Sequence, residues 1–484
     1  MLEVTDIEIK TRLAFDNPWW EEGAVPDQFR EWRRRAYFHG FMELVQQRTV
    51  NRAVVLMGPR RVGKTVMLTQ AVQQLIEDGI SPTSIFFISV DTPTYTGLSL
   101  EKLLRLFLDI HGHGRGDSLY VAFDEIQYHA DWERHLKSLV DSYPTIQFVV
   151  SGSAAAAQKT KSVESGAGRF TDYLLPPLSF AEFLLFRKVD PGLVWLDGKK
   201  PKIPDIEALN RAFVDYINFG GFPEAVLDPT VRANMDRYVA NDIVDKVLLR
   251  DIPSLYGIPD TQELKKFFTV LAYNTGSEIS LERLSQVSGV AKNTLKKYLD
   301  YLEAAFLIRR LHRIGGDAKR FKRVTRFKVH LTNPSIRSAL FGPITGTSDA
   351  MGPLAETAVL CQFAQSRLGQ NIHYAGWKEG EVDIVLSGQS DPNSFNPIEL
   401  KWSDRVASHP ADELRALIEF CKNTNCPVAW LYTKSTATTM DIDGVRINIG
   451  VLSAFCYAVA MKGIDEPLQD GLDPRAFAPF GESG

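Results

Sequence analysis

Gly58-Pro-Arg-Arg-Val-Gly-Lys-Thr65 is the stretch that decides the fold. It matches the pattern G-x-x-x-x-G-K-[ST], follows the apolar run 53–57 and opens a helix-like segment, which is the context that a phosphate-binding loop requires. A glycine-rich turn points backbone N–H groups at phosphate oxygens, and the helix that follows adds its positive end. An accidental loop is the alternative, but this pattern is rare at average composition. The stretch therefore predicts a nucleotide site.

The residue types in the loop indicate ATP and Mg²⁺ as cofactors. Lys64 would reach the β- and γ-phosphates, and the Thr65 hydroxyl would bind Mg²⁺. The residues that we expect to hold the nucleotide are Gly58, Pro59, Arg60, Arg61, Val62, Gly63, Lys64, Thr65 and Val66.

Short apolar runs alternate with helix-length segments after this loop. Such alternation predicts an α/β fold with a parallel sheet that is covered on both faces. The expected strands are residues 53–57, 85–90, 119–123, 146–150 and 171–175, and the expected helices among them are residues 65–77, 98–110 and 132–142.

Polar residues at the ends of these runs extend the predicted site. Asp124 and Glu125 follow an apolar strand, so Asp124 would hold Mg²⁺ and Glu125 would orient or deprotonate the attacking water. Ser151 ends the next strand and would touch the γ-phosphate or the water, although an ordinary polar turn is an alternative. Arg169 precedes the fifth strand and would act on a neighbouring subunit's γ-phosphate, or else pair with a surface carboxylate.

The composition excludes several classes of protein. The chain has 484 residues, a net charge of −4, 44% hydrophobic residues and 24% charged residues, which excludes fibrous, disulfide-rich and mostly disordered chains. The four cysteines lack zinc-ligand spacing, so a reducing compartment is expected. No apolar run reaches the ~18 residues of a membrane span, and the start carries no apolar signal core. We therefore expect a cytoplasmic protein that has no membrane partner.

The region around residues 280–331 predicts a basic DNA-binding module. Two helix-like segments meet at Gly289, a helix-turn-helix pattern, and the runs that follow would form a wing. Residues 292–331 carry 12 Lys or Arg and three Asp or Glu, an excess that suggests a polyanion such as DNA. A protein-docking module or a solvated face is the alternative. The expected DNA-binding residues are Lys292, Asn293, Thr294, Lys296 and Lys297 on the second helix and Lys319, Arg320, Lys322 and Arg323 at the wing tip.

The C-terminal third holds a second cluster of acids. Glu399 and Lys401 are two residues apart on a predicted strand, so their side chains share one face, and Asp383 on the preceding strand could join them. Asp383 and Glu399 would hold Mg²⁺, which would activate water against a phosphodiester, and Lys401 would stabilise the phosphate charge.

This cluster resembles the PD-(D/E)xK nuclease core, and Glu356 matches the acid often found on the first helix of that fold. Val382 stands where the usual proline would be. By this resemblance Glu356, Asp383, Glu399 and Lys401 would be catalytic. A nuclease-like fold without activity, kept for docking, is the alternative.

Six motifs in a fixed order resemble the AAA-type (AAA+) P-loop ATPases of prokaryotes that carry an extra C-terminal region. The motifs are Gly58–Thr65, Phe123–Gln127, Ser151–Ser153, Gly168-Arg169, Pro177–Phe183 and Gly220–Glu224. The resemblance implies the AAA+ sheet order, a helical lid after Ser179, and a homo-oligomer, for which a hexameric ring is one arrangement.

Together these patterns predict an ATP-hydrolysing enzyme that engages DNA and could cleave it. A nucleotide-controlled switch or docking factor is the alternative. The expected parts are an N-terminal arm (1–50), a P-loop ATPase core (51–180), a helical lid (181–260), a winged helix (261–335), a nuclease-like domain (350–460) and a tail (461–484).

Overall fold

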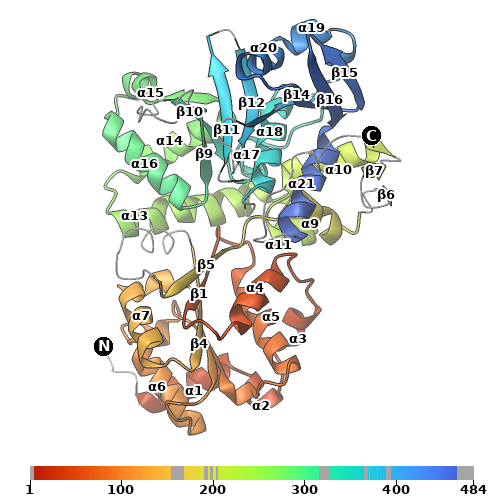
Figure 1. Cartoon of the computed structure of the whole chain (residues 1–484). Helices are drawn as coiled ribbons and strands as arrows, with labels where there is room; N and C mark the ends of the chain where they lie inside the picture. The colour runs from red at the N-terminus through yellow and green to blue at the C-terminus, as the bar shows by residue number, and fades with distance from the viewer. Residues whose placement is uncertain are drawn as a thin grey trace. The chain divides into compact units, whose positions relative to one another are not determined.

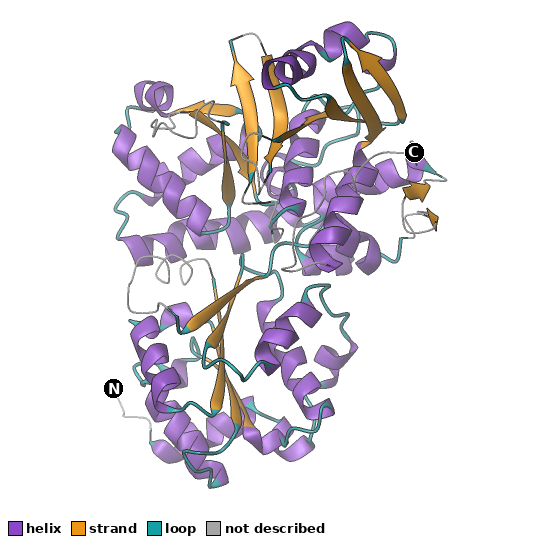
Figure 2. Cartoon of the chain, viewed as in Figure 1, coloured by secondary structure: helices purple, strands orange, loops and turns teal. Residues whose placement is uncertain are grey.

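The computed structural model divides the chain into two compact units, Met1–Pro176 and Pro177–Gly484. Figure 1 colours the chain by residue number, and Figure 2 colours it by secondary structure. The residues that the structure describes are 5–153, 168–189, 194–196, 200–202, 205–314, 326–364, 369, 371–378, 380–388 and 394–465.

The first unit is built on a five-stranded sheet in the order β2-β3-β4-β1-β5. All of its neighbouring strands pair in parallel, which confirms the predicted parallel α/β fold. The β1, β3 and β4 strands are buried along their whole length, as expected for a sheet that is covered on both faces. The strands are β1 (Ala53–Met57), β2 (Ile85–Ser89), β3 (Leu119–Asp124), β4 (Ile146–Gly152) and β5 (Phe170–Leu174).

Helices cover both faces of this sheet (Figure 2). The N-terminal segment, predicted as an arm, is fixed to the sheet by two tryptophans, because the indole N–H groups of Trp19 and Trp20 both donate to the Ile85 carbonyl, at 3.1 and 2.8 Å. The helices are α1 (Asp6–Asp16), α2 (Trp19–Glu22), α3 (Asp27–Glu31), α4 (Phe38–Gln46), α5 (Lys64–Glu77), α6 (Leu100–His111) and α7 (Trp132–Ser142).

The second unit begins with the helical segment that was expected to form a lid. Its first two long helices share a core with α18 (Met351–Gln362) and α21 (Leu452–Asp465): Phe180, Phe213, Val359 and Phe455 belong to one buried cluster. The elements of this segment are α9 (Phe180–Phe186), the short strands β6 (Val194–Leu196) and β7 (Lys200–Lys202), α10 (Ile206–Phe219), α11 (Pro223–Leu227), α12 (Pro229–Ala233), the π-helical turns η5 (Asp236–Asp245) and η6 (Val247–Asp251), and α13 (Ile252–Tyr256).

The middle of the second unit is a helical module with a small sheet. Gly289 ends one helix in the left-handed region at φ 73°, which glycine adopts without a Cβ clash, and the next helix starts three residues later. The three strands pair antiparallel in the order β8-β10-β9. The elements are α14 (Thr261–Tyr273), β8 (Glu278–Ser280), α15 (Leu281–Ser288), α16 (Lys292–Ala304), β9 (Ile308–His312), β10 (Arg326–Leu331) and α17 (Ser335–Phe341).

The C-terminal part is a six-stranded mixed sheet in the order β11-β12-β13-β14-β16-β15. The first three strands pair antiparallel, whereas β13, β14 and β16 run parallel. The predicted tail from residue 461 begins inside α21, and residues 466–484 lie outside the described residues. The remaining elements are β11 (Ile372–Trp377), β12 (Gly380–Ser387), β13 (Phe395–Leu400), α19 (Pro410–Glu413), α20 (Arg415–Thr424), β14 (Val428–Thr433), β15 (Thr438–Ile442) and β16 (Val445–Val451).

Each of the described helices is too short or too polar to cross a bilayer.

Candidate functional site

The predicted phosphate loop joins β1 to α5, and two glycines set its shape. A Cβ on Gly58 would lie 2.2 Å from the Leu175 carbonyl oxygen, so only glycine fits against β5 here. Gly63 has φ 95°, a conformation that costs a glycine little. The Lys64 ammonium turns back over the loop and donates to the carbonyls of Gly58 and Pro59 at 3.1 and 2.9 Å.

The acid at the end of β3 meets the loop, although β4 lies between β3 and β1 in the sheet. The Thr65 hydroxyl donates to Asp124 Oδ2 at 2.6 Å, and the buried Ser151 hydroxyl donates to the other carboxylate oxygen. Burial raises the pKa of the Asp124 carboxyl, and the Glu125 charge adds to this, against the lowering by hydrogen bonds from Ser151 and Thr65. The structure thus brings Thr65, Asp124 and Ser151 together.

Glu125 takes an unusual backbone conformation directly after β3. Its φ is 54°, which is uncommon for a residue with a Cβ. The Gln127 amide donates to the Glu125 carboxylate and accepts a hydrogen bond from the Ser153 N–H at 3.0 Å. Gln127 therefore links the ends of β3 and β4, a role that the sequence reasoning missed.

Arg35 supports the loop from the N-terminal segment. Its guanidinium donates to the carbonyls of Val62 and Pro176, at 2.7 and 2.9 Å, and it is almost fully buried. α3 ends at Glu31, and Trp32 after it has an extended backbone. Arg35 thus reaches the loop through a long-range contact that no local pattern signals.

Arg169 pairs with a carboxylate of its own unit. Its guanidinium lies 2.5 Å from Asp141, and both side chains are more than 40% exposed. This is the alternative that the sequence left open. Action on a neighbouring subunit stays a prediction.

The donor groups at this site fit a magnesium nucleotide. A hydroxyl and a carboxylate oxygen, from Thr65 and Asp124, are ligands that Mg²⁺ accepts. The loop supplies backbone N–H groups and the ammonium of Lys64, which suit phosphate oxygens.

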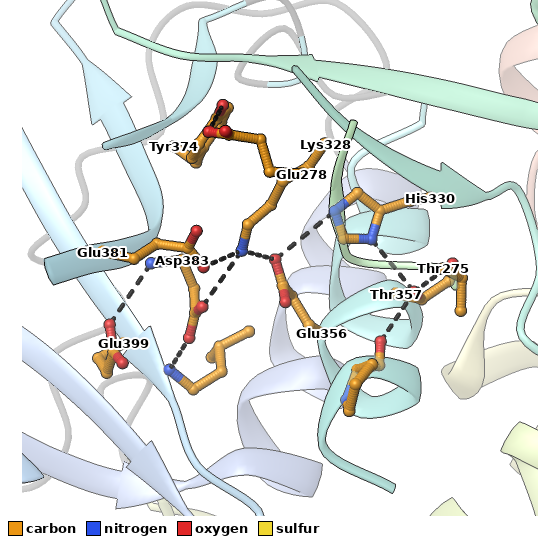
Figure 3. Close-up of polar contacts among 12 residues, drawn as sticks. Thr275, Glu278, Lys328, His330, Glu356, Thr357, Tyr374, Glu381, Asp383 and Glu399 are labelled. Atoms are coloured by element: carbon orange, nitrogen blue, oxygen red, sulfur yellow. Dashed lines mark hydrogen bonds and ion pairs between the residues drawn. The ribbon is translucent and has the colours of Figure 1, made fainter. Parts of the chain in front are cut away.

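The C-terminal residues predicted as catalytic also lie together, and Figure 3 shows three of them, Glu356, Asp383 and Glu399. Lys401 Nζ lies 2.7 Å from Glu399 Oε1, and the Leu400 N–H donates to Asp383 Oδ2 at 3.0 Å. Glu356 faces this group from α18. Burial raises the pKa of Glu356 to about 8, and burial with the Asp383 charge raises that of Glu399 to about 8, in each case against a lowering by a neighbouring lysine.

A lysine that was assigned to no site lies among these acids. Lys328 Nζ is 3.1 Å from Glu356, 2.6 Å from Glu381 and 3.5 Å from Asp383. Burial alone would lower the pKa of Lys328, but the three carboxylates raise it. Among the described residues, no group of three or more His, Cys, Asp or Glu is arranged to hold a metal ion. A Mg²⁺ site at Asp383 and Glu399 stays a prediction.

The predicted DNA-binding residues of α16 are largely exposed. Lys292, Asn293, Lys296 and Lys297 face solvent, Thr294 is half-buried, and Lys292 pairs with Glu282. Lys319, Arg320, Lys322 and Arg323 lie outside the described residues.

Part of the local basic excess is neutralised inside the fold. Arg310 pairs with Asp300 at 2.8 Å and with Glu303. Arg326 lies 3.4 Å from Glu278, and Lys328 lies in the acid cluster. The charge count of the sequence therefore overstates the charge that is available to a partner.

Comparisons with known proteins agree with the first site. Residues 50–184 match the family model of the AAA domain, and residues 210–347 match a domain of unknown function (DUF8612). Residues 50–184 are therefore similar to the AAA domain, and the parallel α/β sheet of the first unit agrees with this match.

The similar proteins themselves are distant. An uncharacterized protein of Haemophilus influenzae is 28% identical over 270 residues, which cover 55% of this chain and 63% of that protein. An uncharacterized protein of Methanocaldococcus jannaschii is 25% identical over 354 residues, covering 69% of this chain and 72% of that one. Among solved structures, C. elegans PCH-2 overlaps with a TM-score of 0.27 at 15% identity, covering 45% of this chain and 65% of that chain.

Proposed function

We propose that this protein hydrolyses ATP at the loop between β1 and α5 and engages DNA through a winged helix at residues 261–335. The observation that carries the first part is the contact between Thr65 and Asp124 at 2.6 Å. It joins the phosphate loop to the acid at the end of β3, and these two groups would hold Mg²⁺ beside the phosphates.

Each residue of the loop site has a role in this proposal. Lys64 neutralises the terminal phosphates, and bound Mg²⁺ supplies further charge neutralisation. Glu125, aimed by its left-handed backbone and by Gln127, orients the attacking water and accepts its proton. Ser151 holds the carboxylate of Asp124 in place.

An arginine that acts in trans would make the active protein a homo-oligomer. Arg169 lies at the surface of its unit, where a subunit interface could release it from Asp141. A hexameric ring is one assembly that would present it to a neighbouring γ-phosphate. Full ATP hydrolysis by a strict monomer would contradict this part of the proposal.

The DNA-binding part rests on the helix-turn-helix order of α15 and α16 and on the exposed start of α16. Lysines at the start of the second helix suit phosphate contacts beside a groove. The antiparallel strands β9 and β10 follow these helices, as the strands of a wing would.

The experiment is an ATPase assay with and without single-stranded, duplex and branched DNA, in which the DNA is also examined for cleavage. We expect DNA to stimulate hydrolysis and the stimulation to fall as salt rises. Lys297→Ala should weaken the stimulation, whereas Lys422→Ala, which removes a lysine from exposed α20, should not. A rate of ATP hydrolysis that none of these DNAs changes at low salt would refute DNA engagement.

A second function is favoured by Lys328. In a docking protein with an inactive nuclease-like fold, the C-terminal acids would hold a lysine and no metal, and ATP would set the conformation. Cleavage through Glu356, Asp383, Glu399 and Lys401 stays a prediction. Mg²⁺-dependent nicking that is lost in Asp383→Asn would support it and exclude the docking function.

A further inference from the structure

One buried ammonium group lies where two parts of the second unit meet. Lys328 comes from β10 of the basic module, whereas its three carboxylate partners come from α18 and β12 of the C-terminal part. Its side chain is 2% exposed, and Figure 3 shows it reaching between Glu356 and Asp383. A buried lysine is rare unless it is paired, and here every partner is an acid.

We propose that Lys328 is the resident cation of this acid cluster and excludes a divalent metal ion from it. Without Lys328, the buried carboxylate of Glu356 and the largely buried one of Asp383 would lose the ammonium group that pairs with both of them, and a buried charge without its partner is strongly unfavourable. A metal ion bound by the same oxygens would face the ammonium at close range and be repelled. The cluster therefore holds either Lys328 or a metal ion.

Neighbouring contacts keep β10 in this position. The Tyr374 hydroxyl on β11 donates to Glu278 on β8 at 2.7 Å. The hydroxyls of Thr275 and Thr357 are 3.0 Å apart, and Thr357 also contacts His330 Nδ1 at 3.1 Å. The lysine is thus delivered by a strand that is fixed to the C-terminal part on both sides.

These ion pairs therefore hold the basic module against the C-terminal part. A divalent cation would enter only after β10 had withdrawn Lys328. This inference goes beyond the proposed function, because it holds whether or not the protein hydrolyses ATP or binds DNA; Mg²⁺-dependent cleavage through Asp383 would contradict it.

The test measures Mn²⁺ binding by electron paramagnetic resonance, with the full chain and without nucleotide. Every variant carries Asp124→Asn, so that the ATP site contributes no signal, and failure here leaves the ATPase proposal untouched. We expect the Lys328 chain to show no Mn²⁺ site that depends on Asp383. The Lys328→Met variant should gain one Mn²⁺ site, with an affinity for Mn²⁺ at least ~10-fold above that of the chain that keeps Lys328. Adding Asp383→Asn should remove this site.

Two results would overturn the inference. One is a Mn²⁺ site in the Lys328 chain that Asp383→Asn abolishes, because metal and lysine would then coexist. The other is a folded Lys328→Met variant that binds Mn²⁺ no more tightly than its parent. Lys422→Met, on the exposed surface of α20, is the matched control and should leave Mn²⁺ binding unchanged.

A second measurement applies if Lys328→Met does not fold. The double variant Lys328→Met/Asp383→Asn removes one positive and one negative charge together. Its thermal unfolding temperature should therefore rise from that of Lys328→Met towards that of the parent. A double variant that is no more stable than Lys328→Met would show that charge pairing is not what Lys328 provides, and would overturn the inference.

Discussion

Gly58→Ala tests the phosphate loop at its most crowded point. The added Cβ would lie 2.2 Å from the Leu175 carbonyl oxygen and 3.2 Å from its carbonyl carbon. Both are backbone atoms of the segment that follows β5, and the Leu175 N–H donates to the Met57 carbonyl at 2.7 Å. Neither the new Cβ nor the Leu175 carbonyl can rotate to relieve this clash, because both are fixed to the backbone. The start of the loop must therefore move.

The size of the movement sets the expected loss. Restoring an ordinary contact of ~3.5 Å requires a shift of about 1 Å. A displacement of that size in groups that position a ligand costs about 100-fold, or about 3 kcal/mol of binding free energy. Titration calorimetry with ATP and Mg²⁺ measures this loss directly.

A matched substitution separates the clash from a general effect of alanine. Gly116 has no atom within 4 Å of an added Cβ and no left-handed backbone, so Gly116→Ala should bind ATP as the parent does. Equal ATP affinity in Gly58→Ala and the parent would refute the placement of the nucleotide at this loop.

Three further predictions follow from the same structure. Glu125→Gln should keep ATP affinity and lose about 10²–10⁴-fold in turnover; unchanged turnover in a phosphate-release assay would contradict its role as the base. Glu356 binds its proton more tightly in the folded state, where its pKa is about 8, than in the unfolded state. Stability should therefore fall as pH rises from 6.5 to 8, and Glu356→Gln should flatten this slope by at most about 1 kcal/mol per pH unit in urea unfolding; an unchanged slope would contradict the raised pKa. Replacing both Lys296 and Lys297 by Ala should reduce the salt dependence of DNA binding by about two phosphate contacts; an unchanged slope in fluorescence titrations would remove α16 from the interface.

Local patterns were enough for the sheet of the first unit and for three of its helices. Its strands are short apolar runs separated by helix-length segments, and the loop motif fixes the start of α5, so these five strands and three helices could be predicted from the residues themselves. The pairing of Glu399 with Lys401 likewise follows from the two-residue period of a strand.

Long-range contacts could not be predicted in the same way. Lys328 is 55 residues from Asp383 in the sequence and lies in a run of basic residues, so a charge count assigns it to a DNA-binding surface. Arg35 likewise lies in a basic stretch but supports the loop by bonding to Val62 and Pro176. In both cases the tertiary fold determines the partner of the basic side chain, and the neighbouring sequence does not.

The central claim is that a nucleotide lies in the loop between β1 and α5, with Mg²⁺ held by Thr65 and Asp124. A crystal structure of the protein grown with Mg²⁺ and a non-hydrolysable ATP analogue tests it most directly. We predict density for the triphosphate against the backbone N–H groups of residues 59–65, with the metal ion contacting the Thr65 hydroxyl. A triphosphate bound elsewhere, with this loop unchanged, would contradict the account.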